Sequence, residues 1–135
     1  MTSNDKGLRT SFSIGHVEID HFGFCRVTFD TSNTDTLDVV SAEELVEAVF
    51  ATCRGKKYAV LTDARGTSGT VTPKAREYIR NAPKMVQVRL AVAFVVDSVA
   101  NRVIANLYIK INRPPNPTKV FNNEADAIVW LQQYV

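Results

Sequence analysis

The stretch "SAEELVEAVFATCRGKKYAVLTD", residues 41–63, predicts a helix followed by a buried strand. Ser41 and Glu44 have the spacing of a capping box, and Gly55 lies just beyond the expected end of the helix. One helical face is apolar and is formed by Leu45, Val46, Val49, Phe50 and Cys53. Residues 57–63 are a short, nearly continuous apolar run, which is typical of a strand covered on both faces. This stretch therefore predicts an α/β fold.

The rest of the chain continues the alternation of helices and strands. Thr72 and Pro73 form an N-cap and first-position pair. We expect a helix over 73–82, a strand over 88–96, a helix over 98–112, a strand over 118–121 and a helix over 122–135 capped by Asn122 or Asn123. Strands that alternate with helices favour parallel pairing through right-handed crossovers.

Ahead of these units, two segments with alternating apolar and polar residues predict a β-hairpin. They are "FSIGHVEID" (12–20) and "FGFCRVTFD" (22–30), with turn residues between them in "DHFG" (20–23). The expected fold is a mixed sheet of about five strands with this hairpin and about four packed helices. We expect one domain over 1–135, with residues 1–8 as a frayed N-terminal lead-in.

The net charge of +2 conceals an uneven distribution. Residues 64–123 hold ten basic and two acidic residues, whereas the rest of the chain holds six basic and twelve acidic ones. This polarity suits an anionic partner or self-association through opposite faces, and folding that intermixes the two sets is an equal alternative. No apolar run approaches the ~20 residues that span a bilayer. The polar N-terminus is unlike a signal or transit segment, so we expect a cytoplasmic protein.

Three stretches together resemble a known family: "GKKYAVLTDARG" (55–66), "LAVAFVVDSVANRVIANLYIKINRPPNPTKVF" (90–121) and "NEADAIVWLQQY" (123–134). In this order they resemble bacterial SpoIIAA-like proteins, relatives of STAS domains that are grouped with the SEC14-like lipid-binding fold. The resemblance covers residues 10–134. It implies the same mixed α/β fold and a role in binding a protein partner or a lipid.

The resemblance also implies a regulatory loop. STAS domains that antagonise anti-sigma factors carry a phosphorylatable serine in an Asp-Ser-Ser-Gly motif at the start of a helix. The equivalent segment here, "TSGTVTPK" (67–74), lacks that motif. The candidate switch or anion loop comprises Asp63, Arg65, Ser68, Thr70 and Thr72. Thr72 is the position most like the family's serine, and it is also an ordinary N-cap.

A second candidate surface lies on the helix expected over 98–112. Arg102, Asn106 and Lys110 are spaced four residues apart opposite an apolar stripe, and residues 98–123 contain no acidic residue. This row suits an acidic face, such as the glutamate-rich helix of another copy, or an anionic lipid headgroup. A merely solvated helix face is the simpler alternative.

The residues give little support to catalysis, to a metal or to a cofactor. His16 and His21 lie in or beside the hairpin without the neighbours of a nucleophile or zinc motif. Cys25 and Cys53 lack metal-site spacing and are expected to be buried free thiols. Nucleic-acid binding is disfavoured because Tyr78 and Tyr108 fall on apolar helix faces.

The leading hypothesis is therefore a non-enzymatic regulatory or protein-interaction module of the STAS-like type, without cofactor. It would bind a protein partner, associate with itself, for instance as a homodimer, or do both. The alternative is a SEC14-like carrier of a small apolar ligand or lipid. A continuous apolar pocket beside residues 98–112 would favour the carrier, and an exposed patch on a packed core would favour the interaction module.

Overall fold

The computed structural model describes residues 9–30, 37–65, 71–97, 106, 109–110 and 115–135. Its strands are β1 (Arg9–Phe12), β2 (Gly15–Ile19), β3 (Cys25–Phe29), β4 (Tyr58–Asp63), β5 (Arg89–Val95) and β6 (Thr118–Phe121). Its helices are α1 (Val39–Cys53), α2 (Pro73–Asn81), α3 (Pro83–Val88) and α5 (Glu124–Gln132). The expected α/β class and mixed sheet are confirmed, with six strands in place of about five.

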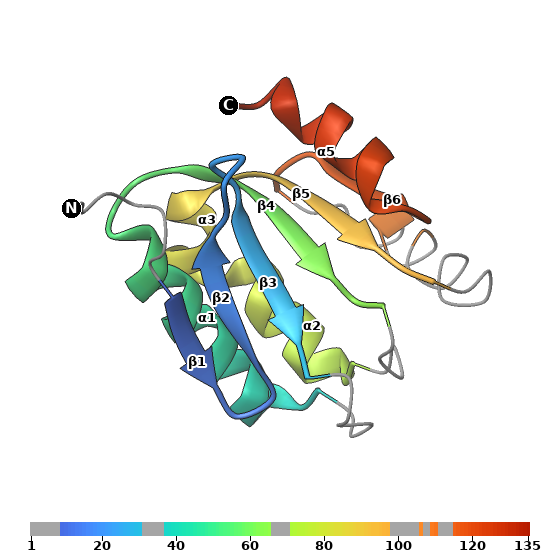
Figure 1. Ribbon diagram of the computed structural model, residues 1–135. Helices are drawn as coiled ribbons and strands as arrows, with labels where there is room; N and C mark the ends of the chain where they lie inside the picture. The colour runs from blue at the N-terminus through green and yellow to red at the C-terminus, as the bar shows by residue number, and fades with distance from the viewer. Residues whose placement is uncertain (1–8, 31–36, 66–70, 98–105, 107–108, 111–114) are drawn as a thin grey trace.

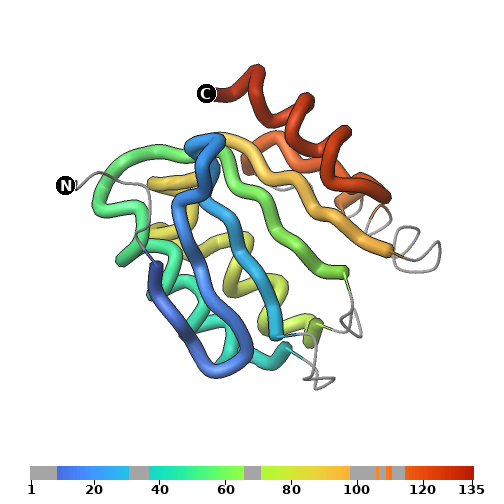
Figure 2. Tube along the Cα trace, in the orientation of Figure 1, coloured from blue at the N-terminus to red at the C-terminus, as the bar shows by residue number. Residues whose placement is uncertain are grey.

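The strands form one sheet in the order β1-β2-β3-β4-β5-β6. The pairs β1–β2 and β2–β3 are antiparallel, and the pairs from β3 to β6 are parallel, as the alternation of elements predicts. Helices α1, α2 and α3 lie on one face of this sheet and α5 lies on the other, above β4, β5 and β6 (Figures 1 and 2). The described helices therefore cover both faces of the sheet at β4 and β5, and only one face at β1, β2 and β3.

Alternation along β4 divides the core between the two faces. Val60 packs towards α1, whereas Ala59 and Leu61 pack towards Ala127 and Leu131 of α5. All five are fully or almost fully buried. Burial of a side chain such as leucine contributes roughly 1.5–3 kcal/mol, so the apolar run that predicted a doubly covered strand holds both layers to the sheet.

The N-terminal region differs from the expected two-stranded hairpin. The segment expected to form one strand over 12–20 breaks after Phe12, and a tight turn pairs Phe12 with Gly15. This adds the edge strand β1. Gly15 permits the arrangement, because a Cβ atom there would overlap the carbonyl oxygen of Thr28 on β3.

The caps of the helices are only partly as predicted. Asp38, not Ser41, caps α1: its Oδ1 accepts from the Ser41 backbone N–H at 2.9 Å, so the N-cap lies three residues earlier than expected. The capping box of Ser41 and Glu44 is therefore wrong. Thr72 does cap α2, since its Oγ1 accepts from the Ala75 N–H at 3.2 Å. Asn123 likewise caps α5 through the Asp126 N–H.

Two further predictions concern the middle of the chain. The short helix α3 lies between the helix expected over 73–82 and the strand expected over 88–96, and Pro83 occupies its first position. Most of the helix expected over 98–112 lies outside the described residues. Within it, Asn106, Ile109 and Lys110 are helical. None of the helices in the described part of the chain is long and apolar enough to cross a membrane.

Candidate functional site

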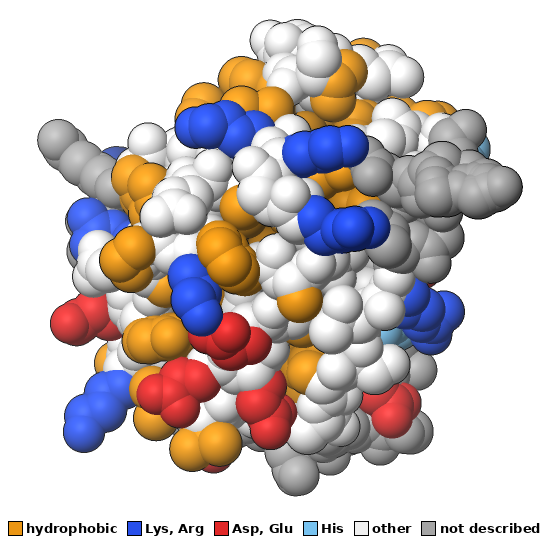
Figure 3. All heavy atoms as spheres, turned by 90° about the vertical axis from the view of Figure 1, so that its left-hand side faces the viewer, with side chains coloured by type: hydrophobic (Ala, Val, Ile, Leu, Met, Phe, Trp, Pro, Cys, Tyr) orange, Lys and Arg blue, Asp and Glu red, His pale blue; other side chains and the backbone are white. Residues whose placement is uncertain are grey.

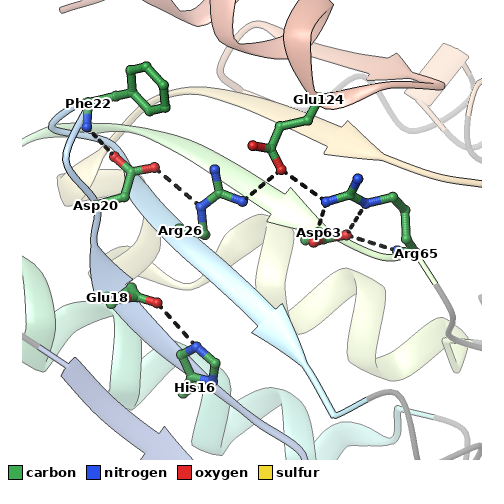
Figure 4. Close-up of polar contacts among 8 residues, drawn as sticks. All are labelled: His16, Glu18, Asp20, Phe22, Arg26, Asp63, Arg65 and Glu124. Atoms are coloured by element: carbon green, nitrogen blue, oxygen red, sulfur yellow. Dashed lines mark hydrogen bonds and ion pairs between the residues drawn. The ribbon is translucent and has the colours of Figure 1, made fainter.

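An ionic network of five side chains lies on the face of the sheet that carries α5. We define the network as Asp20, Arg26, Asp63, Arg65 and Glu124 (Figure 4). Asp20 follows β2, Asp63 ends β4 and Glu124 begins α5. The β2–β3 hairpin, the end of β4 and the start of α5, which are far apart in sequence, therefore supply one connected set of charges.

Arg26 reaches the network because of strand alternation. Its neighbours in β3, Cys25 and Val27, are buried towards α1, so Arg26 points to the opposite face. Its Nε donates to Asp20 Oδ2 at 3.3 Å, and its Nη1 donates to Glu124 Oε1 at 3.1 Å. Only 16% of the side chain is exposed. Arg26 therefore joins the β2–β3 turn to the first turn of α5.

Asp20 also organises the turn from which it projects. Its Oδ1 accepts from the backbone N–H groups of Phe22 and Phe24 at 2.9 and 3.0 Å. Gly23 adopts φ = +84° in the same turn, a conformation that glycine reaches without steric cost. The Asp20 carboxylate thus orders the turn with one oxygen and holds Arg26 with the other.

Asp63 and Arg65 form a clamp where β4 ends. Arg65 donates through Nε and Nη2 to the two carboxylate oxygens of Asp63, at 2.9 and 2.8 Å. The Arg65 backbone N–H also donates to Asp63 Oδ1 at 3.1 Å. The same Nη2 reaches Glu124 Oε1 at 2.9 Å. A bidentate arginine–carboxylate pair fixes geometry better than a single contact, so Arg65 has a defined direction although 40% of its side chain is exposed.

The hydrogen bonds of the network favour the charged forms of four of its groups. The hydrogen bond from Arg65 lowers the pKa of Asp63 below its ordinary value and outweighs burial, which raises it. The hydrogen bond from Arg26 lowers the pKa of Glu124 in the same way. Burial alone lowers the pKa of Arg26, but Glu124 and Asp20 together raise it. The Asp63 hydrogen bond raises the pKa of Arg65.

These directions decide what chemistry the network offers. General acid–base catalysis needs a group with a pKa near the working pH, and the pKa values of Asp63 and Glu124 move away from neutrality. Among the described residues, no three His, Cys, Asp or Glu side chains are grouped so as to hold a metal ion. The network is a fixed pattern of charges, suited to recognition of a charged surface.

Beside the network, the sheet presents a polar face. Helix α5 packs on β4, β5 and β6, and α1 packs on the other side of β1, β2 and β3. His16 and Glu18 of β2 point to the same side as Arg26 (Figure 4), and His16 Nε2 lies 3.3 Å from Glu18 Oε1. These side chains are 22% and 32% exposed. We call His16, Glu18, Arg26 and Thr28 the open sheet face.

The structure brings some of the predicted site residues together and separates others. Asp63 and Arg65, two members of the candidate loop, pair directly. Thr72 lies at the start of α2, where its N–H also donates to the Leu37 carbonyl ahead of α1. Asn106 and Lys110 are exposed on their helix. Ser68, Thr70 and Arg102 lie outside the described residues.

Sequence reasoning missed Asp20, Arg26 and Glu124 as site residues. Strand alternation places Arg26 on the face opposite α1, and a glutamate beginning a helix is a recognisable signal. No sequence pattern, however, brings Arg26 and Glu124 together, because 98 residues separate them. Cys25 and Cys53 are buried free thiols, as expected.

Comparison with known proteins supports the fold. Residues 27–135 match the model of a family described as Domain of unknown function (DUF7793). The structure resembles that of an uncharacterised DUF3478-family protein from Shewanella loihica PV-4 with a SpoIIAA-like fold, at TM-score 0.61 and 17% identity over 97% of this chain and 98% of that chain. This confirms the SpoIIAA-like fold expected from sequence. An Arthrobacter sp. FB24 protein of unknown function is 25% identical over 87% of this chain and 92% of its own, at TM-score 0.31. No curated protein matches the chain.

Proposed function

Because the chain belongs to the family Domain of unknown function (DUF7793), whose description assigns no activity, we propose from its geometry that it is a non-enzymatic protein-interaction module acting in the cytoplasm. Its contact surface comprises the ionic network and the open sheet face. One observation carries this assignment: Glu124 Oε1 accepts hydrogen bonds from both Arg26 and Arg65, at 3.1 and 2.9 Å. Partly exposed charges are thereby fixed over a polar sheet surface.

Fixed charges suit recognition for an energetic reason. Binding orders flexible side chains at roughly 0.5–1.5 kcal/mol each, and this cost is smaller for Arg65 and Glu124 because they already hold one another. Their outer parts remain exposed, at 40% and 34% of each side chain. Charges held in fixed positions also favour partners whose surface has the complementary electrostatic potential. We expect a partner that presents both an acidic and a basic group to this surface.

Affinity capture from the native host with matched variants tests this function. Arg65→Gln removes one positive charge within the network, and Lys119→Gln removes one from exposed Lys119 on β6. We expect wild type and Lys119→Gln to capture the same protein, and Arg65→Gln to lose it while retaining its unfolding temperature within a few degrees. Mass spectrometry of the captured chain also reports phosphorylation at Ser68, Thr70 or Thr72.

Two outcomes contradict this function. Equal capture by all three proteins would remove the ionic network from the contact surface. A lipid released by organic extraction from each purified variant, with no captured protein, would favour the carrier alternative instead.

A further inference from the structure

The outer side of α1 carries a stripe of exposed residues whose charges change sign along the helix. The stripe consists of Val40, Glu43, Glu47, Ala51 and Arg54, all exposed and spaced three or four residues apart. This spacing puts Val40, Glu43, Glu47 and Ala51 on one face of the helix, and Arg54 follows at its C-terminal end. The N-terminal half of the stripe is acidic, and its C-terminal end is basic.

The residues that follow α1 extend the basic end. Arg54 is the C-cap at φ = 52°, and Lys56 and Lys57 follow in an exposed turn. Figure 3 shows the side of the molecule that carries β1 and α1, with acidic side chains gathered in its lower part and most Lys and Arg side chains above them. The charge is therefore graded along this side of the molecule.

We propose that this stripe is an interface with a second copy of the chain, in which the two α1 helices pack antiparallel about a two-fold axis. Under such an axis, the acidic half of each stripe lies opposite the basic end of the other. Each pairing occurs twice, because residue i contacts j and j contacts i. The charge gradient of α1 is complementary to its own reversed copy, and this selects a second copy as the occupant.

The spacing along α1 sets the register. Glu43 and Arg54 are about 16 Å apart along the axis at 1.5 Å per residue. An axis passing near residues 48–49 brings Glu43 opposite Arg54 of the second copy, and Glu47 opposite Ala51 of the second copy. The small side chain of Ala51 permits the close approach that such a centre requires. Val40, 60% exposed, lies at the outer end of the stripe.

Lys84 of the same chain contacts this stripe from the neighbouring helix α3. Lys84 of α3 donates to Glu47 Oε2 at 2.6 Å, and its Nζ lies 5.2 Å from the centre of the Phe50 ring. Glu47 is therefore already neutralised at the centre of the interface, where two copies of it approach one another. Glu43, at the periphery, forms no salt bridge with any residue that the structure describes, which makes the pair of Glu43 and Arg54 the specific ionic contact.

One helix pair is a small interface, and its ionic contacts lie in water. We therefore expect a weak dimer that dissociates as salt rises from about 50 mM to about 1 M, since the screening length shortens to about 3 Å over that range. This association does not depend on the partner proposed for the ionic network, because the stripe shares no residue with it.

Sedimentation equilibrium of the full chain with two charge reversals tests the interface. Glu43→Arg places four positive side chains at the two peripheral contacts, and Arg54→Glu places four negative ones there. Each variant alone is expected to be monomeric at concentrations where wild type dimerises. An equimolar mixture is expected to form a heterodimer, because each contact then pairs Arg with Glu. The mixture isolates pairing from folding, since both chains must be folded to associate.

Lys110→Glu is the matched control, because Lys110 is exposed and lies outside α1. It is expected to dimerise as wild type does. The interface is wrong if wild type stays monomeric at low salt, if the two variants dimerise separately, or if their mixture remains monomeric. Loss of dimer in Lys110→Glu alone would instead assign self-association to the row of Asn106 and Lys110. The expected loss of the captured partner in Arg65→Gln does not depend on any of these results.

Discussion

Arg65 donates through Nη2 to Glu124 Oε1 at 2.9 Å and thereby joins the end of β4 to the first residue of α5, 59 positions later in the chain. Arg26 donates to the same oxygen from β3. The N-terminus of α5 is thus held by two arginines from two adjacent parallel strands. Glu124 serves both the fold and the candidate site, because its carboxylate positions α5 and also fixes the partly exposed side chain of Arg65.

The contribution of Glu124 to stability is measurable by substitution. Glu124→Gln removes the charge that both arginines share, and we expect a loss of about 1 kcal/mol in the free energy of unfolding because the site is partly exposed. Asp126→Asn is the control, since it removes another acid from the first turn of α5 without touching the network. Urea unfolding at pH 7 measures both. A larger loss in Asp126→Asn would attribute the effect to the helix dipole instead.

The network also implies a dependence on acid. The pKa values of Asp63 and Glu124 are lowered from their ordinary values of 3.8 and 4.5, so these groups stabilise the fold fully above those values. This stability is lost as pH falls through the lower values of the folded state. The difference in unfolding free energy between wild type and Asp63→Asn/Glu124→Gln should therefore be constant from pH 7 to pH 5 and shrink below about pH 4. A difference that stays constant down to pH 2.5 would contradict this assignment.

Thr72 provides a test of its role as a cap. Thr72→Ala removes the acceptor for the Ala75 N–H, and we expect it to cost about 0.5–2 kcal/mol and to leave partner capture intact. Thr72→Ser keeps the oxygen and should retain most of the stability. Loss of the captured partner in Thr72→Ala at unchanged unfolding temperature would indicate a regulatory switch.

The core thiols are expected to be unreactive in the folded chain. A hydrogen bond with Cys53 raises the pKa of Cys25 well above its ordinary value, and burial raises it further. Both side chains are 0% exposed, and the thiolate is the reactive form. Iodoacetamide at pH 8 should therefore leave the native mass unchanged and add two groups in urea. Modification of either cysteine under native conditions would show that the core between β3 and α1 opens readily.

Gly15 is the position where the turn between β1 and β2 depends most on the absence of a side chain. A Cβ there would overlap the Thr28 carbonyl oxygen, and backbone atoms cannot yield as a side chain can. We expect Gly15→Ala to cost about 1–3 kcal/mol, as overpacking does. Gly23→Ala is the control: its Cβ meets nothing within 4 Å, and only the positive φ opposes it. Equal tolerance of both substitutions in thermal unfolding would contradict the close approach of β2 and β3.

Sequence periodicity predicted most of the fold because the same residues supply the periodicity and the core. Leu61, Ala91 and Leu131 are apolar, fall at strand or helix spacing and are buried as that spacing requires. The turn after Phe12 was missed although the alternation changes phase there: the apolar residues Phe12 and Ile14 are at even positions, and Val17 and Ile19 are at odd ones. Asp38 was missed as a cap because Ser41 offered an equally good local signal.

The candidate site was predictable only where its contacts are local. Asp63 and Arg65 are two residues apart, and their pairing follows from the end of a strand. The contacts of Glu124 with Arg26 and Arg65 depend on how α5 lies across the sheet, which a single sequence does not state. Long-range contacts between charged groups therefore appear only in the structure.

The most direct test of the interaction function is the affinity of the captured partner for purified variants. Calorimetric titration should give at least a tenfold weaker Kd for Arg65→Gln than for wild type, about 1.4 kcal/mol, with Lys119→Gln within about twofold of wild type. Equal Kd values for all three proteins, at equal unfolding temperatures, would contradict the assignment of the ionic network as the contact surface.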